Sequence, residues 1–256
     1  MDVAVRHALF AKVALGCRIL GGEGLTRAAF GHVSVRLDDG LIAIKARGRN
    51  EEGLEFTSAR DVLTVTLDGT LVDGGEGLVA PNESQIHLEI FKLRPDVRSV
   101  VHIHPAEIVA LGAVGRRLLP LYGAFSPSGL KLATKTLRYY PKSLLISTAE
   151  LGREVAECLG DGEACILKGH GIVTVGASIE EAVLGAIALG ELAHVNWLAA
   201  AAGEPEPLDD VEIAAWDAFF ARYPTRVFSG RTDTGEPAEW HFYARRDAQR
   251  RSQGNG

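Results

Sequence analysis

The sequence contains few cysteines and no excess of basic residues. Cys17, Cys158 and Cys165 are odd in number and none belongs to a Cys-x-x-Cys pair, so we do not expect a disulfide framework. The 256 residues include 27 Lys and Arg against 33 Asp and Glu, which gives a net charge of −6. Because nucleic-acid binding requires a basic surface, we expect no nucleic-acid partner. A small anionic substrate needs only a local basic pocket and is compatible with this charge.

Long apolar runs are absent as well. The most apolar stretch, residues 184–203, is interrupted by Glu191, His194 and Asn196, so it lacks the ~18 uninterrupted apolar residues of a typical membrane span. The N-terminal segment MDVAVRHALF has no basic region followed by an apolar region, as a secretory signal would. Together with the cysteine usage, these absences predict a cytoplasmic protein without membrane contact.

The hydrophobic pattern predicts both helices and strands. Helical spacing and stop signals indicate helices over residues 3–20, 84–93, 150–160 and 179–202. Runs of β-branched and apolar residues indicate strands over 32–37, 41–46, 62–67, 99–105 and 143–147, with two more flanking a Gly-His-Gly turn within 164–176. We find no repeat or linker, so we expect a single α/β domain over 1–256 with a mainly antiparallel sheet. Residues 203–256 form a C-terminal extension whose polar end is expected to be frayed.

Three histidines have the arrangement of a metal site. His102 and His104 are two residues apart in a predicted strand, so both side chains point to one face. His170 lies between glycines at a predicted strand turn, where its ring is unobstructed. Three imidazoles with an open fourth position are typical of a catalytic zinc site, and manganese, iron or cobalt also accept such ligands. The alternative is that the His-x-His pair is an accident of the core or surface.

Glu83 precedes the predicted helix over 84–93. A carboxylate at a helix N-terminus is favoured by the dipole and the free N–H groups, so simple capping would explain it. A general acid/base, or a displaceable metal ligand, would explain it equally well. The sequence spacing between Glu83 and His102 does not decide between these interpretations.

These residues together resemble the class II aldolase/adducin family. The matching stretches are FGHVSVRL (30–37), APNESQIHLEIFKLRPDVRSVVHIHP (80–105) and LKGHGIVTVGASIEEA (167–182). The resemblance covers roughly residues 5–200 and implies an αβα fold around a central, mostly antiparallel sheet. It implies one divalent metal ion per subunit, held by His102, His104 and His170, with Glu83 as catalytic acid/base. It also implies a homo-oligomer, commonly a tetramer with active sites at subunit interfaces.

Three departures from the family pattern affect the expected substrate. Sugar-phosphate members carry Asn at the position of His32 and a Ser-Ser pair at the position of Pro81-Asn82. The loop that usually cradles phosphate is here Lys-Ala-Arg-Gly-Arg-Asn, residues 45–50. Pro81 offers neither a hydroxyl nor an N–H donor. We therefore expect that phosphate binding is lost, while Ser34 and Asn82 still contact the substrate.

Arginines in that loop suggest another anion. Arg47 and Arg49 alternate with glycine, and guanidinium groups bind carboxylates in a bidentate manner; the alternative is two surface arginines beside Glu51 and Glu52. Together with the Gly-His-x-Ser motif, they resemble the family's decarboxylase branch, which acts on hydroxylated aromatic acids. Tyr122 could line an aromatic pocket, although most such aromatics belong to the core.

The resemblance to this branch implies a non-oxidative decarboxylase of a hydroxylated aromatic dicarboxylate such as 3,4-dihydroxyphthalate. Zinc is the first choice of metal, and either Glu83 or His32 delivers the proton to the ring carbon. The alternative within the family is an aldolase or epimerase acting on a sugar or sugar phosphate. A third hypothesis, an adducin-like interaction module without catalysis, conflicts with the presence of all three histidines and Glu83.

Overall fold

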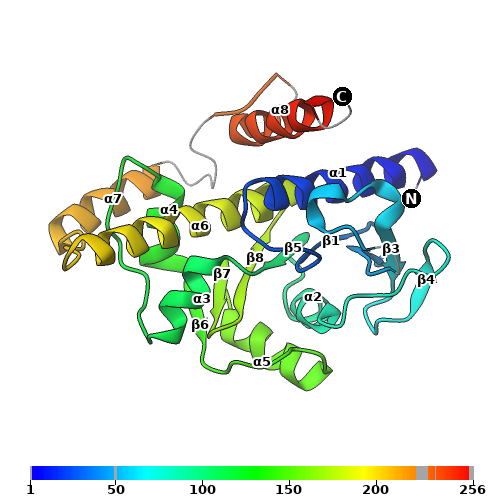
Figure 1. Ribbon diagram of the computed structural model, residues 1–256, viewed down its shortest axis with the longest axis horizontal. Helices are drawn as coiled ribbons and strands as arrows, with labels where there is room; N and C mark the ends of the chain where they lie inside the picture. The colour runs from blue at the N-terminus through cyan, green and yellow to red at the C-terminus, as the bar shows by residue number, and fades with distance from the viewer. Residues whose placement is uncertain (1, 49–50, 223–229, 234, 254–256) are drawn as a thin grey trace.

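A central sheet lies between two layers of helices (Figure 1). The computed structural model describes residues 2–48, 51–222, 230–233 and 235–253. One layer consists of α1 (Val3–Gly22) and α6 (Ile179–Ala202), and the opposite layer consists of α2 (Ser84–Leu93) and α5 (Ala149–Leu159). The predicted αβα architecture is therefore confirmed.

The described strands form one eight-stranded sheet in the order β4-β3-β2-β1-β5-β8-β7-β6. Their bounds are β1 (His32–Arg36), β2 (Ile42–Lys45), β3 (Val62–Val65), β4 (Leu71–Asp73), β5 (Ser99–Ile103), β6 (Leu137–Tyr140), β7 (Ala164–Leu167) and β8 (Gly171–Gly176). Neighbouring strands are antiparallel except β6 and β7, which are parallel. The expected mainly antiparallel sheet is confirmed.

Alternation along β1 separates an apolar face from a polar one. Val33 and Val35 pack in the core beneath α1 and α6, whereas His32 and Ser34 point to the opposite side and contact a histidine of α2. Because successive side chains of a strand face opposite sides, both features follow from one sequence pattern. His32 is paired with His102 of β5, so the histidines of the two strands gather at the same end of the sheet.

One predicted strand is wrong. Residues 143–147 form no strand, and the strand of this region is β6, which ends at Tyr140. The Ile146 N–H donates a hydrogen bond to the Glu83 carboxylate, at 3.0 Å, rather than to a neighbouring strand. Ile146 is fully buried, while its neighbours Leu144 and Leu145 are exposed. The apolar run therefore covers one end of the sheet as irregular chain.

The described part of the C-terminal extension contains helices that the sequence pattern did not predict, α7 (Asp210–Arg222) and α8 (Ala238–Gln253). Elsewhere, the structure adds the helices α3 (Ala106–Ala113) and α4 (Pro127–Lys131) and the single turns η1 (Leu54–Phe56), η2 (Ala59–Asp61) and η3 (Leu132–Thr136). α8 lies on the outer side of α1 (Figure 1). Its Trp240 is buried, and its Asp247 accepts hydrogen bonds from Arg18 of α1. Residues 245–253 of the end that was expected to be frayed are helical, whereas residues 254–256 lie outside the described residues.

α6 is long and apolar enough to cross a membrane by composition alone. In the fold, however, 56% of its most apolar 18-residue stretch is buried, and Val183, Leu189 and Leu192 are fully enclosed in the core. Complete burial of each such side chain stabilises the folded state by about 1.5–3 kcal/mol. The apolar character of α6 is thus accounted for by its place in the core.

Candidate metal and substrate site

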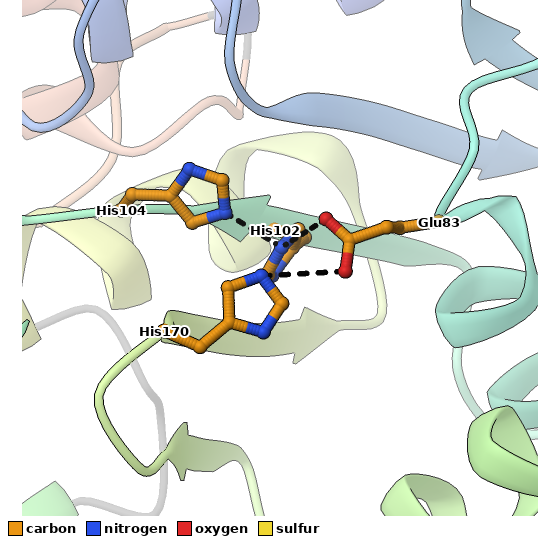
Figure 2. Close-up of side chains that lie close together, drawn as sticks. All are labelled: Glu83, His102, His104 and His170. Carbon is orange, nitrogen blue, oxygen red and sulfur yellow. Dashed lines mark hydrogen bonds and ion pairs between the residues drawn. The ribbon is translucent and has the colours of Figure 1, made fainter. Parts of the chain in front are cut away.

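Three histidines and one glutamate converge at one end of the sheet. His102 is the fourth residue of β5 and His104 follows the end of that strand, whereas His170 lies in the turn between β7 and β8. Glu83 comes from the segment directly before α2. Figure 2 shows the three rings and the carboxylate pointing toward a common centre. Their ligand atoms all lie within 4.8 Å of one another, so the structure brings the predicted residues together.

The separations of these atoms fit a small cation. His102 Nε2 lies 3.4 Å from Glu83 Oε2, and His170 Nε2 lies 3.3 Å from Glu83 Oε1. His104 Nε2 lies 2.9 Å from His102 Nε2. With bonds of about 2.1 Å, the donor atoms of a tetrahedral ion stand about 3.4 Å apart. The cluster can therefore hold one divalent ion.

The protonation of the rings also suits a metal. His102 Nδ1 lies 2.8 Å from the carbonyl oxygen of Ile172, and an oxygen that only accepts requires that Nδ1 carry the proton. The lone pair of His102 is consequently on Nε2, which faces the cluster. Burial, followed by the neighbouring His102 and His170, lowers the pKa of His104 to about 3. Neutral imidazole is the form that coordinates metal ions.

Glu83 does not act as a helix cap. It occupies the N-cap position of α2, but its side chain makes no capping hydrogen bond. Its Oε1 accepts from the Ile146 N–H at 3.0 Å, and both oxygens face histidines. Burial raises the pKa of the Glu83 carboxyl and the neighbouring His102 and His170 lower it, with the result that this pKa lies well below its usual range. The capping interpretation is therefore not supported, and the Glu83 carboxylate lies in the histidine cluster.

The cluster borders a pocket of about 370 Å³. Besides Glu83 and His104, its lining includes apolar, polar and cationic residues: Phe30, His32, Lys45, Arg47, Glu51, Pro81, Asn82 and Leu145. Lys45 is paired with Glu51, so Arg47 is the cation of this lining that makes no ion pair with a described residue. Together with an ion in the cluster, Arg47 suits an organic anion of modest size.

Of the residues predicted to bind the substrate, some line the pocket and others do not. Asn82 and Arg47 line the pocket, and the Arg47 side chain makes no ion pair with a described residue. Arg49 lies outside the described residues. Ser34 is fully buried behind His32, and Tyr122 packs against Phe125 away from the pocket lining.

Two residues near the site were not predicted to take part. Lys45, the last residue of β2, is only 4% exposed, lines the pocket and pairs with Glu51. His87 of α2 is fully buried and bridges the side chains of His32 and Ser34. Burial, and then His102, lowers the pKa of His87 to about 3. The sequence signal for Lys45 was a lysine at the end of an otherwise apolar strand. The signal for His87, its position one helical turn from Glu83, was ambiguous.

Sequence comparisons place the chain among known proteins. The profile of the family "Class II Aldolase and Adducin N-terminal domain" matches residues 11–197. A 3,4-dihydroxyphthalate decarboxylase of Arthrobacter keyseri is 37% identical over 206 residues, which cover 79% of this chain and 83% of that protein. An L-fuculose phosphate aldolase of Methanococcus maripaludis is 31% identical over 182 residues, covering 71% of this chain and 92% of that protein.

A structural comparison supports the same fold. An aldolase II superfamily protein from Pseudomonas syringae superposes with a TM-score of 0.80, covering 95% of this chain and 93% of that one. The two are 22% identical in sequence, so this likeness concerns the fold alone.

Proposed function

The chain belongs to the class II aldolase and adducin family, and we propose that within this family it is a metal-dependent decarboxylase of a hydroxylated aromatic dicarboxylate. The proposed substrate is 3,4-dihydroxyphthalate or a close analogue. One observation carries the proposal: the Glu83 and histidine cluster opens into a pocket that also contains Arg47, a cation that makes no ion pair with a described residue. The relatives that are 3,4-dihydroxyphthalate decarboxylases support it, with 36–39% identity over three quarters or more of this chain.

The metal is proposed to be zinc, held by His102, His104 and His170. Three imidazole ligands with an open fourth position are typical of catalytic zinc, and manganese, iron and cobalt accept the same set. When bound, such an ion supplies Lewis-acid stabilisation for negative charge that develops on a substrate oxygen. An ortho-hydroxy carboxylate offers two oxygens for this purpose.

The residues of the chain then bind, orient and transfer protons. Arg47 holds the second carboxylate of the substrate and fixes the orientation of the ring. Glu83 removes the proton of the phenolic hydroxyl. The phenolate directs electron density to the ring carbon that bears the first carboxylate, and Glu83 returns its proton to that carbon, which becomes tetrahedral. The bond between this carbon and the carboxylate then breaks, carbon dioxide leaves, and the electron pair of that bond restores the aromatic ring and the phenolate. The phenolate takes a proton from solvent, so one proton is consumed per turnover.

The experiment compares two reactions on one metal-loaded preparation. We expect carbon dioxide from 3,4-dihydroxyphthalate and no aldehyde from a panel of sugar phosphates. His104→Ala and treatment with a chelator should each abolish carbon dioxide release, by about 100-fold or more for the variant. His194→Ala is the matched control, because His194 is exposed, pairs with Glu107, and belongs neither to the cluster nor to the pocket lining. Aldehyde from a sugar phosphate without decarboxylation would overturn the proposal in favour of an aldolase.

We also propose that the protein works in the cytoplasm as a homotetramer or larger oligomer. Several large apolar side chains are exposed on the described surface: Val114, Phe125, Trp197, Leu198 and Val211. Burial between subunits would remove such side chains from water. Light scattering after size-exclusion chromatography should give about four times the 27.4 kDa of one chain. A mass of one chain would contradict this part of the proposal.

A further inference from the structure

Three buried polar side chains form a chain of hydrogen bonds that ends at the pocket. Ser34 Oγ lies 2.6 Å from His87 Nδ1, and His87 Nε2 lies 2.7 Å from His32 Nδ1. Ser34 and His87 are completely buried, and His32 is 7% exposed. The order of groups is therefore serine hydroxyl, first imidazole, second imidazole and pocket.

The serine hydroxyl sets the direction of every bond in this chain. Ser34 has one hydroxyl proton, and its Oγ bonds only His87 Nδ1 within the described part of the structure. A buried donor without an acceptor is unfavourable, so Ser34 donates to His87 Nδ1. His87 must then be neutral, with its proton on Nε2, and it donates that proton to His32 Nδ1. His32, which accepts at Nδ1, carries its own proton on Nε2.

Every other arrangement leaves the hydroxyl proton of Ser34 without an acceptor among the described residues. If His87 were protonated on Nδ1, either as the other tautomer or as the cation, Ser34 could only accept, and its buried proton would have no partner among the described residues. A protonated His32 would donate from Nδ1 to His87 and force the same result. The hydrogen-bond inventory alone thus selects one state.

We propose that Ser34 and His87 are positioning residues that hold His32 as the Nε2–H tautomer, so that His32 presents a fixed hydrogen-bond donor to a carboxylate oxygen of the substrate, an inference that rests on the proposed function. His32 Nε2 has no hydrogen-bond partner among the described residues, and His32 lines the same pocket as Glu83. The series of hydrogen-bonded side chains from His32 through His87 to Ser34 does not reach solvent at its far end, because Ser34 is fully buried. If His32 gave up a proton, this series could not supply another one. His32 therefore recognises the substrate, and Glu83 remains the group that transfers the proton.

The first experiment reads the tautomers directly. Long-range ¹H–¹⁵N correlation spectra of the full-length, zinc-loaded and ¹⁵N-labelled protein distinguish Nδ1–H from Nε2–H imidazole, and His32→Gln and His87→Gln identify the two rings by loss of signal. We expect the neutral Nε2–H pattern for both His32 and His87. In Ser34→Ala the fixed donor to His87 is missing, so the His32 pattern should change. A neutral Nδ1–H pattern, or an imidazolium pattern, for His32 in the unaltered protein would overturn the inference.

A matched pair of variants tests the consequence for binding. His87→Gln retains a side-chain N–H that can donate to His32 Nδ1, whereas His87→Glu, similar in size, offers only acceptors and should reverse the His32 tautomer. We expect His87→Glu to weaken binding of phthalate, a probe that lacks the ring hydroxyls, by about 10–100-fold, while His87→Gln stays within about threefold. Zinc content and melting temperature, measured on both, show whether each variant is folded and loaded.

The outcomes separate this inference from the proposed function. Equal phthalate affinity in the two His87 variants would overturn the role of His87, whatever the reaction of the enzyme. The expected tautomer and affinity pattern, combined with no carbon dioxide from 3,4-dihydroxyphthalate, would support the positioning role and reject only the proposed reaction. For an active enzyme, His87→Glu should raise KM more than it lowers kcat, because binding and not proton transfer is affected.

Discussion

His32 of β1 and His102 of β5 are directly paired in neighbouring antiparallel strands, and their ring centroids lie 5.2 Å apart. One ring belongs to the metal cluster and the other ends the Ser34–His87 chain. The β1–β5 register therefore fixes the distance between the proposed substrate donor and the metal. A slip of one residue would move His32 to the opposite face of the sheet, so the register itself is part of the site.

Removal of the Glu83 charge should separate metal binding from proton transfer. Glu83→Gln keeps an oxygen that can accept from the Ile146 N–H and leaves all three histidines in place. We expect about one metal ion per chain and a fall in kcat of about 10²–10⁴, the usual contribution of a general acid/base. Metal analysis and decarboxylation kinetics measure both quantities. Glu157→Gln, on the exposed side of α5, is the control, and an unchanged kcat in Glu83→Gln would rule out the assigned role.

A single added methyl group should disturb the metal site without removing a ligand. A Cβ at Gly171 would overlap the Ile103 carbonyl oxygen and lie 2.5 Å from Cδ2 of His104. Gly171→Ala should therefore push the His104 ring away from the cluster and weaken zinc binding by about 10–100-fold, as other losses of ligand support do. Competition with a chromophoric chelator measures the affinity. Gly203→Ala, which meets no atom within 4 Å, should bind zinc normally.

Local sequence patterns predicted which histidines come together in the cluster, because part of its geometry is local. The pairing of His102 with His104 was expected from the two-residue period of a strand, and in the structure His104 directly follows the last residue of β5. The freedom of His170 follows from its flanking glycines. Only the meeting of these pieces with Glu83 needed the family resemblance. The positions of His87 and Lys45 could not be predicted in this way, because each depends on which neighbouring element packs opposite it.

The missed parts of the fold have a similar cause. Residues 143–147 have a strand-like composition, but their backbone serves the site, since Ile146 donates to Glu83. α8 is polar along most of its length. It is held by Trp240 in the core and by the ion pair of Asp247 with Arg18, two residues that are more than 200 positions apart in the sequence. Periodicity within one segment contains no information on such distant partners.

The three cysteines should differ strongly in reactivity. Burial raises the pKa of the Cys17 thiol to about 12. At Cys158, the hydrogen bond from Cys165, whose sulfur lies 3.9 Å away, lowers the thiol pKa. Because the thiolate is the nucleophile, iodoacetamide at neutral pH should alkylate Cys158 first and leave Cys17 unmodified until the protein unfolds. Peptide mass spectrometry of timed samples measures the order. Early modification of Cys17 would contradict its burial, and Cys158→Ser should remove the fast phase.

The ion pair between α1 and α6 should make a pH-dependent contribution to stability. Lys12 Nζ lies 2.6 Å from Glu180 Oε1. Burial opposes ionisation of Glu180, but the hydrogen bond with Lys12 outweighs it and lowers the pKa of the carboxyl. A carboxyl whose pKa is lower in the folded state stabilises that state above its unfolded pKa of about 4.3 and loses this effect as pH falls through the folded value.

Glu180→Gln should consequently cost about 1 kcal/mol or less of unfolding free energy at neutral pH, since Lys12 is one-third exposed and keeps its second partner, Glu236. The difference from the unaltered protein should shrink as the pH falls below the unfolded pKa of Glu180. Urea unfolding at neutral and acidic pH measures both values. Lys12→Met provides the other side of a double-mutant cycle: with the cation removed, Glu180→Gln should have a smaller effect at neutral pH. A difference that grows toward acidic pH would show that the folded-state pKa of Glu180 is raised, and the ion pair would then not stabilise the contact between α1 and α6.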